Sequence, residues 1–266
     1  QSLWQLSAFE QGVTVSIALV GTVIGSVIGG FPADLFGRKK SLFAIAILYF
    51  LSALGTAYAV DWSVFLLFRF LGGLGVGISS VVAPLYISEI APPAKRGRLV
   101  ALFQFNIVFG ILMAYLSNYL LSGIGGLNDW RWMLGVQAIP SVLFLVTVTF
   151  IPESPRWLIA KFNDLKKARE ILTRTDPDGV DEAIRLAIEE EKSMKQKAGF
   201  GALFSPRFFS STMLAVLIAF FNQVSGINAI IYFAPRIFEM AGISTENALI
   251  STIGIGLVNL FATFFG

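Results

Sequence analysis

Three amide side chains stand close together in one apolar stretch of the sequence, at Asn222, Gln223 and Asn228. An amide both donates and accepts hydrogen bonds, which suits the adjacent hydroxyl groups of a neutral sugar. Ser225 and Gly226 lie inside the cluster and favour a break in a helix, and helices broken at mid-membrane depth form the binding sites of many carriers. For this cluster we therefore favour a binding site over simple hydrogen bonding between helices.

Two further amides, Gln104 and Asn259, also lie inside apolar stretches. Polar groups in a bilayer core need partners, so each amide could bind a ligand or join two helices, and the two interpretations are equally good. Ile107 and Ile111 follow Gln104 on neighbouring faces of the expected helix and are included in the candidate site. Because the apolar stretches hold no cluster of cations, we expect no anionic substrate.

The composition excludes most familiar enzyme chemistry. The chain has 266 residues with no His and no Cys. It therefore has no Ser-His-Asp or Cys-His relay, no His-ligated metal, no thiolate zinc site and no disulfide. No other acid–base or metal constellation is present, so we expect neither an enzyme nor a cofactor. The net charge of +3 is too small to indicate nucleic acid as a partner.

Long uncharged runs indicate the elements that must position these residues. Hydrophobic residues make up 55% of the chain, charged residues only 14%, and the mean hydropathy is +0.73. Roughly 20 apolar residues cross a bilayer core, and in lipid they must be helical because no water satisfies the backbone. The sequence thus predicts an all-α polytopic membrane protein with seven transmembrane helices. The runs are 11–33, 41–60, 62–88 (broken only by Arg69), 99–128, 132–152, 208–235 and 247–266.

The basic residues predict the orientation of these helices. All but three of the 20 Lys and Arg residues lie on alternate loops, at 34–40, 92–98 and 153–207. Basic loops stay in the cytoplasm, so the N-terminus is expected outside the plasma or inner membrane of the cell. Neither a signal peptide nor a preceding helix explains that start, and the last residues are still hydrophobic, so we expect an internal fragment of a longer protein.

The long segment at 153–207 is the expected cytoplasmic part. Apolar residues at helical spacing predict two short amphipathic helices in it, at 164–174 and 180–197. Val180, Ile184, Ala187 and Ile188 share one face of the second helix.

Three loops on the predicted cytoplasmic side each place a carboxylate near basic side chains. A single surface ion pair contributes about 0–1 kcal/mol, whereas a partly desolvated network could bias an equilibrium between two conformations. We expect Pro32 and Gly37 to make a tight turn and Gly30 to allow a close approach of helices. The candidate network comprises Gly30, Asp34, Gly37, Arg38, Lys39, Glu89, Arg96, Arg98, Glu153 and Arg156.

Arg69 is the only cation within a predicted span, and a charge there is usually paired or functional. A static ion pair and a role in proton transfer are equally good interpretations. The nearby Gly73 and Gly77 have the spacing of a close helix-packing face.

Three motifs occur in order: Gly-x-x-x-Asp-x-x-Gly-Arg-Lys at 30–39, Pro-x-Tyr-x-x-Glu-Ile-Ala-Pro-x-x-x-Arg-Gly at 84–97, and Pro-Glu-Ser-Pro-Arg-Trp-Leu at 152–158. Together they resemble the sugar porter family of the major facilitator superfamily, along essentially the whole chain. The resemblance implies a partial major facilitator fold covering helices two to eight of twelve. Residues 1–152 would then be the N-terminal half without its first helix, 153–207 the intracellular helical linker, and 208–266 the start of the C-terminal half.

The resemblance also implies roles for individual residues. The sugar-binding amides of the family fall on Gln104, Asn222, Gln223, Asn228 and Asn259, and the outer gate falls on Tyr232 and Phe233. Asn222 stands where the family usually has Gln, and Phe233 where many members have a second Tyr, so the identity of the sugar stays open. Arg69 matches an Arg that pairs with an Asp of helix one in proton-coupled members, so proton coupling stays open too.

The function implied is transport of a neutral hexose or pentose by alternating access, in a lipid bilayer and with no obligate protein partner. A sugar sensor of the same fold fits the motifs equally well. An unrelated seven-helix receptor fits the helix count and the long cytoplasmic loop, but it leaves the three motifs without a role.

Overall fold

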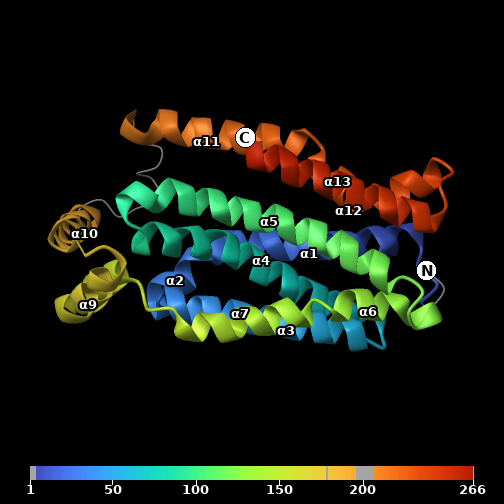
Figure 1. Cartoon of the computed structure of the whole chain (residues 1–266), viewed down its shortest axis with the longest axis horizontal. Coiled ribbons are helices and arrows are strands. Elements are labelled where there is room, and N and C mark those ends of the chain that lie inside the picture. Colours follow the sequence, from blue (N-terminus) through green and yellow to red (C-terminus); the bar gives the residue numbers. More distant parts are fainter. Residues whose placement is uncertain (1–3, 178, 196–205, 266) are drawn as a thin grey trace. The chain divides into compact units, whose positions relative to one another are not determined.

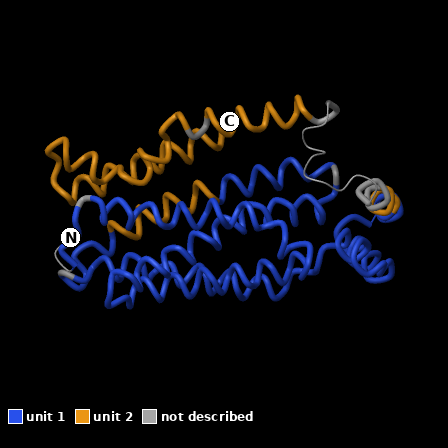
Figure 2. The backbone as a smooth tube through the Cα atoms, turned by 180° about the vertical axis from the view of Figure 1, so that it is seen from behind, with its two compact units in different colours: residues 1–106, 120–184 blue, residues 107–119, 185–266 orange. Residues whose placement is uncertain are grey.

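The computed structural model describes residues 4–177, 179–195 and 206–265, and this part of the chain contains helices and no strand (Figure 1). It divides into two compact units. Unit 1 comprises residues 1–106 and 120–184, and unit 2 comprises residues 107–119 and 185–266 (Figure 2). The all-α fold predicted from the uncharged runs is confirmed.

Within the described residues, six helical stretches are long and apolar enough to cross a membrane, by length and composition: Phe9–Ile28, Arg38–Tyr58, Trp62–Ile90, Ala94–Leu121, Asp129–Phe150 and Thr245–Phe265. The predicted span at 208–235 folds instead as two helices, and its first part contains the shorter apolar stretch Phe209–Phe221. The helices are α1 (Ala8–Ile28), α2 (Gly30–Phe36), α3 (Arg38–Tyr58), α4 (Trp62–Ile90), α5 (Pro93–Leu121), α6 (Asp129–Gly135), α7 (Ala138–Phe150), α8 (Pro155–Phe162), α9 (Leu165–Thr175), α10 (Val180–Lys195), α11 (Pro206–Val224), α12 (Ile227–Met240) and α13 (Thr245–Phe265), with a 3₁₀ turn η1 (Gly126–Asn128) before α6.

The break between α11 and α12 falls at Ser225 and Gly226, as the sequence predicts. Gly226 caps α12 with φ +74°, a left-handed conformation that glycine adopts without steric cost. Ser225 accepts a hydrogen bond at its Oγ from the backbone N–H of Ile227, at 3.4 Å. The chain therefore stops one helix and starts another within a single apolar run.

The turn expected at Pro32 is located differently. Pro32 lies in the first turn of α2, where a missing N–H is tolerated. Because proline has no N–H, it cannot donate to the carbonyl of Ile28 four residues earlier, and α1 ends at Ile28. Gly37 alone makes the turn into α3, with φ +95°. The expected tight turn is thus correct for Gly37 and wrong for Pro32.

In unit 1, α1 packs on α4 through glycine faces. A Cβ atom added to Gly73 would collide with the backbone carbonyl of Ala18, and one added to Gly77 with that of Thr22. Because backbone meets backbone there, no side chain can move aside. The predicted close-packing face is confirmed.

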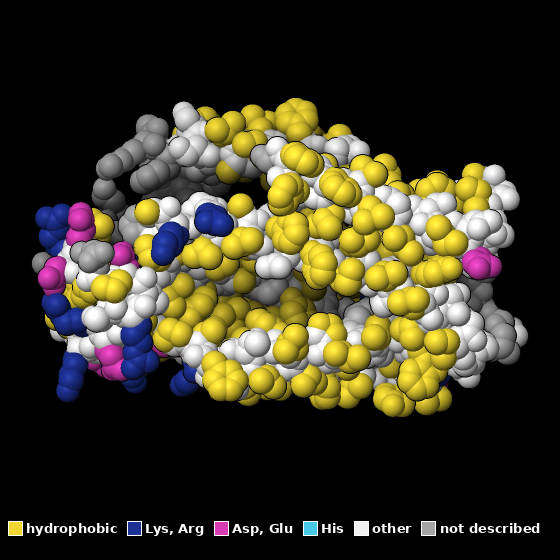
Figure 3. All heavy atoms as spheres, viewed as in Figure 1, with side chains coloured by type: hydrophobic (Ala, Val, Ile, Leu, Met, Phe, Trp, Pro, Cys, Tyr) yellow, Lys and Arg dark blue, Asp and Glu magenta, His cyan; other side chains and the backbone are white. Residues whose placement is uncertain are grey.

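The predicted amphipathic helices correspond to α9 and α10, and the shared face of α10 is buried at Val180, Ile184 and Ala187 and half-buried at Ile188. Positions 196 and 197 of the prediction lie outside the described residues. Figure 3 shows Lys, Arg, Asp and Glu side chains gathered around α9, whereas α3, α6 and α7 present mainly hydrophobic side chains on this face. Unit 1 therefore has one charged end beyond an apolar length of helices.

Candidate functional site

Arg38 and Glu89 form a buried, two-pronged ion pair at the charged end of unit 1. Arg38 opens α3 and Glu89 lies in the last turn of α4, and their side chains are only 9% and 8% exposed. Arg38 Nε donates to Glu89 Oε2, and Nη2 to Oε1, both at 2.8 Å. The third guanidinium nitrogen donates to the carbonyl of Ala33 at 3.0 Å and lies 3.2 Å from Asp34 Oδ1. This arrangement uses the full fork of the arginine.

Glu153 caps the N-terminus of α3 from the loop between α7 and α8. Its carboxylate accepts the backbone N–H of Arg38 at 2.9 Å and of Lys39 at 3.1 Å. The first N–H groups of a helix have no partner within it and carry partial positive charge, so a carboxylate is favoured there. The cap residue of α3 is Gly37, and a Cβ at that position would collide with the Glu153 carboxylate. Gly37 thus leaves the space that Glu153 fills.

Two aromatic side chains fix the same loop. Trp157 Nε1 donates to the carbonyl of Asp34 at 2.9 Å, and Tyr86 Oη donates to the carbonyl of Pro152 at 2.9 Å. Neither aromatic residue is among the predicted network residues, although both lie in the same sequence motifs as Glu89 and Glu153. The start of α8 was also missed, although Ser154 before Pro155 is a strong helix-start signal: Ser154 Oγ accepts the N–H of Trp157.

We define the Arg38 cluster as Asp34, Arg38, Lys39, Glu89 and Glu153. All five residues belong to the predicted network, and they lie close together in unit 1.

The Arg38 cluster as defined does not include the other predicted arginines or Gly30. Within the described residues, neither the half-buried Arg96 nor the exposed Arg98 forms an ion pair, and Arg156 lies half-buried in α8. A Cβ at Gly30 would meet nothing within 4 Å, so the expected close approach of helices is absent at that position. It occurs at Gly29 instead, where a Cβ would lie 3.2 Å from the Cα of Ile78.

In unit 2, the predicted amides lie on both sides of the break in the helix. Asn222 and Gln223 belong to the last turn of α11, and their side chains lie outside the described part of the structure. Asn228 is exposed in the first turn of α12. A helix end and a helix start next to each other leave backbone C=O and N–H groups without helical partners, which adds polar groups to this part of the chain.

Pro235 creates a second irregularity, one turn beyond Tyr232 in α12. Proline has no N–H, so the carbonyl of Ile231 lacks its usual helical donor. Tyr115 of α5 supplies one, with its Oη donating to that carbonyl at 2.8 Å. This tyrosine was missed from sequence, where Pro235 marks the unpaired carbonyl but gives no indication of its donor.

Both residues of this hydrogen bond line a cavity of about 270 Å³, which is close to the lower limit of about 300 Å³ for small-molecule pockets. Two predicted site residues, Ile111 and Tyr232, line it. Asn118 and Thr252 add polar groups to the lining and are not among the predicted site residues. The complete lining is Ile111, Ala114, Tyr115, Asn118, Ile231, Tyr232, Pro235, Leu249 and Thr252.

The remaining candidates lie near this cavity in sequence but are not part of its described lining. Asn259 is half-buried in α13, one turn past Gly256, where a Cβ would lie 3.1 Å from atoms of Leu112 and Tyr115. Ile107 is 44% exposed one turn before Ile111.

Three further candidates are not among its described lining residues. Phe233 is exposed in α12 next to Tyr232. Gln104 is exposed in the part of α5 that belongs to unit 1, and Arg69 is half-buried in α4. The structure therefore brings Ile111 and Tyr232 to one cavity but does not place all the predicted binding residues around it.

Long apolar helices, one charged end and a broken helix with amides beside the break define a multi-pass membrane protein of the major facilitator type. The chain belongs to the sugar transporter family: the family described as "Sugar (and other) transporter" matches residues 2–266.

Relatives with printed functions are similar along nearly the whole chain. The arabinose-proton symporter of Bacillus subtilis (strain 168) is 37% identical over 268 residues, covering 99% of this chain and 58% of the relative. The galactose-proton symporter of Escherichia coli (strain K12) is 40% identical over 264 residues, covering 98% and 56%. The proton:xylose symporter XylE bound to 6-bromo-6-deoxy-D-glucose matches with a TM-score of 0.83 at 32% identity, covering 99% and 61%. The chain spans little more than half the length of these relatives.

Proposed function

We propose that the protein containing this chain carries a neutral monosaccharide, a hexose or a pentose, across a membrane by alternating access. The observation that supports this most is the interruption at Gly226, with Asn222 and Gln223 before it and Asn228 after it. Amides at a helix break can hydrogen-bond the hydroxyl groups of a sugar without any charge. The relatives named for arabinose, galactose and xylose support the same substrate class.

The proposed division of labour follows the motifs. Residues 1–152 belong to an N-terminal half, 153–207 to a cytoplasmic linker and 208–266 to the start of a C-terminal half. The first residue lies on the outer side of the plasma or inner membrane. Gln104, Ile107, Ile111 and Asn259 complete the sugar site, and Tyr232 with Phe233 forms its outer gate. The protein is proposed to be a carrier and not an enzyme, in keeping with a family of transporters.

The Arg38 cluster is proposed to stabilise one conformation of the carrier. Its buried ion pair and its helix cap join three stretches that are far apart in sequence. A transition that separates the stretches would have to expose or re-pair these charges, which provides a two-state element. Arg96, Arg98, Arg156 and Gly30 are proposed to take part in the conformation in which the cluster rearranges.

Coupling to protons is proposed through Arg69, by analogy with the relatives named as proton symporters. An intramembrane arginine is costly unless it is paired, so its pairing is the element that a proton could change. Sugar uptake that follows an imposed pH gradient, and that loses this dependence in Arg69→Gln, is the expected result. Uptake with no response to the gradient argues for facilitated diffusion instead.

The sugar site is tested by Gln223→Ala in the whole protein. Loss of one or two hydrogen bonds is expected to weaken sugar binding about tenfold, because each bond contributes about 0.5–1.5 kcal/mol. The matched control is Gln137→Ala, which removes an exposed amide from the start of α7 in unit 1. Binding is measured by titration with arabinose, galactose and xylose, and membrane insertion by fractionation.

Unchanged sugar affinity in Gln223→Ala, or an equal loss in Gln137→Ala, argues against the assigned site. Uptake of labelled sugar into vesicles separates a carrier from a sensor of the same fold. A sensor binds the sugar without accumulating it inside the vesicle.

A further inference from the structure

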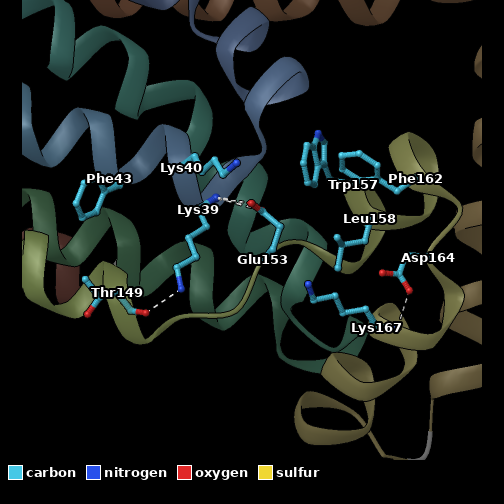
Figure 4. Close-up of a pocket in the computed structure, with 10 residues that line it drawn as sticks. All are labelled: Lys39, Lys40, Phe43, Thr149, Glu153, Trp157, Leu158, Phe162, Asp164 and Lys167. Atoms are coloured by element: carbon cyan, nitrogen blue, oxygen red, sulfur yellow. Dashed lines mark hydrogen bonds between the residues drawn. The ribbon is translucent and has the colours of Figure 1, made fainter.

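A groove of about 860 Å³ lies in unit 1 between α3, α7, α8 and α9, and Glu153 forms part of its wall. Figure 4 shows three lysines around it, with Lys39 and Lys40 from the start of α3 and Lys167 from α9. Aromatic and aliphatic side chains form the rest of its wall. The complete lining is Lys39, Lys40, Phe43, Thr149, Glu153, Trp157, Leu158, Phe162, Asp164 and Lys167.

The two carboxylates in the groove are bound by backbone N–H groups. Glu153 caps α3, and Asp164 caps α9 by accepting the N–H of Lys167 at 3.0 Å. Lys39 Nζ donates to the neutral carbonyl of Thr149 at 2.8 Å. None of the three lysines forms an ion pair with a described residue, so positive charge remains for an outside ligand.

Basic and apolar side chains lie next to each other along the groove, with Phe43 on one side and Trp157 and Phe162 on the other (Figure 4). Lys39 and Lys40 lie in the first turn of α3, and Phe43, one turn further, is 39% exposed. Exposed apolar side chains continue from there along α3 and α7, at Ile47 and Val146. A ligand that satisfies both the lysines and this apolar surface carries an anionic group and at least one long hydrocarbon chain.

We propose that this groove binds an anionic phospholipid. Its phosphate contacts the ammonium groups of Lys40 and Lys167, and an acyl chain runs past Phe43 over the apolar surface of α3 and α7. A free phosphate would use the lysines but leave the aromatic wall uncovered, which is why a lipid is the better occupant. The proposed orientation places the groove at the cytoplasmic leaflet, which is the one richer in anionic lipid.

The test is native mass spectrometry of the purified chain, released from detergent micelles that hold equal amounts of phosphatidylglycerol and phosphatidylcholine. We expect bound phosphatidylglycerol in clear excess over phosphatidylcholine. A lysine near an anionic lipid surface contributes about 1 kcal/mol, so Lys40→Gln with Lys167→Gln is expected to weaken phosphatidylglycerol binding about 25-fold, or about fivefold per lysine. Lys40→Arg with Lys167→Arg keeps the positive charge at both positions and is expected to retain phosphatidylglycerol binding.

The matched control is Lys161→Gln with Lys166→Gln, which removes the same charge from exposed positions of α8 and α9 outside the groove. Circular dichroism on heating confirms that each variant is folded. Equal binding of the two lipids by the unaltered chain, or the same loss in the control as in the test variant, overturns the proposal. Displacement of phosphatidylglycerol by inorganic phosphate also overturns it, because the groove would then be a site for free anions.

Discussion

The guanidinium of Arg38 and the carboxylate of Glu89 lie 51 residues apart in sequence and meet through two hydrogen bonds of 2.8 Å, with both side chains almost fully buried. The pair joins the first residue of α3 to the last turn of α4. Two charges removed from water in this way are stable only together, since each one satisfies the other.

Arg38→Met should therefore destabilise the protein more than its lost contacts suggest. It leaves the Glu89 carboxylate buried without its partner, which costs about 3–5 kcal/mol of unfolding free energy. Glu89→Gln added to Arg38→Met should recover a large part of that loss, because no buried charge then remains. Unfolding in mixed detergent micelles is measured for Arg38→Met, for Glu89→Gln and for the double variant. A double variant as unstable as the sum of the two single variants contradicts this account.

Glu153→Ala should lower the free energy of unfolding by about 1–2 kcal/mol, the range found when a helix cap is removed. Glu153→Gln should lose less, because an amide oxygen still accepts a backbone N–H. Asp61→Ala is the control: Asp61 is the cap residue of α4, but its side chain makes no cap hydrogen bond. The three variants are compared by melting in detergent, and an equal loss of stability in Asp61→Ala and Glu153→Ala argues against the cap.

Gly25→Ala should destabilise the contact of α1 with α4 by about 1–3 kcal/mol, as overpacking does in a tight interior. A Cβ at Gly25 would lie 3.0 Å from the backbone nitrogen of Ile78 and would collide with the carbonyl of Leu74. Gly12→Ala in the same helix has nothing within 4 Å and should be neutral or slightly stabilising, because alanine is the better helix former. Thermal melting separates the two; equal melting temperatures contradict the tight packing.

The sequence predicts those features that depend on local composition. Long uncharged runs predict the apolar helices, and Gly226 beside Ser225 predicts the break before α12. The spacing of Gly73 and Gly77 predicts the packing face. In each case the physical cause lies within a few residues, either as hydrophobic length, as a left-handed backbone angle or as the absence of a side chain.

Tertiary partners cannot be predicted in the same way. Trp157 donates to the carbonyl of Asp34 across 123 residues, and no local pattern indicates that pairing. The turn assigned to Pro32 was misplaced for a related reason: a proline suits both a turn and the first turn of a helix, and the residues after it decide between the two. The predicted network likewise included Arg98, which is basic and close in sequence but exposed.

Tyr115 and Pro235 give the sharpest test of unit 2, because the proline leaves a carbonyl without a donor and the tyrosine supplies one. Tyr115→Phe removes only a hydroxyl and should cost about 0.6–1.5 kcal/mol in unfolding free energy, since it leaves the carbonyl of Ile231 unpaired. In a Pro235→Ala background, the new N–H at position 235 can bond that carbonyl, so the same Tyr115→Phe change should cost less than half as much. Tyr119→Phe, one turn along α5, has no hydroxyl partner among the described residues and serves as the control. The four variants of this double-mutant cycle are compared by unfolding in detergent. Equal costs of Tyr115→Phe in the two backgrounds mean that the hydroxyl does not compensate for the proline.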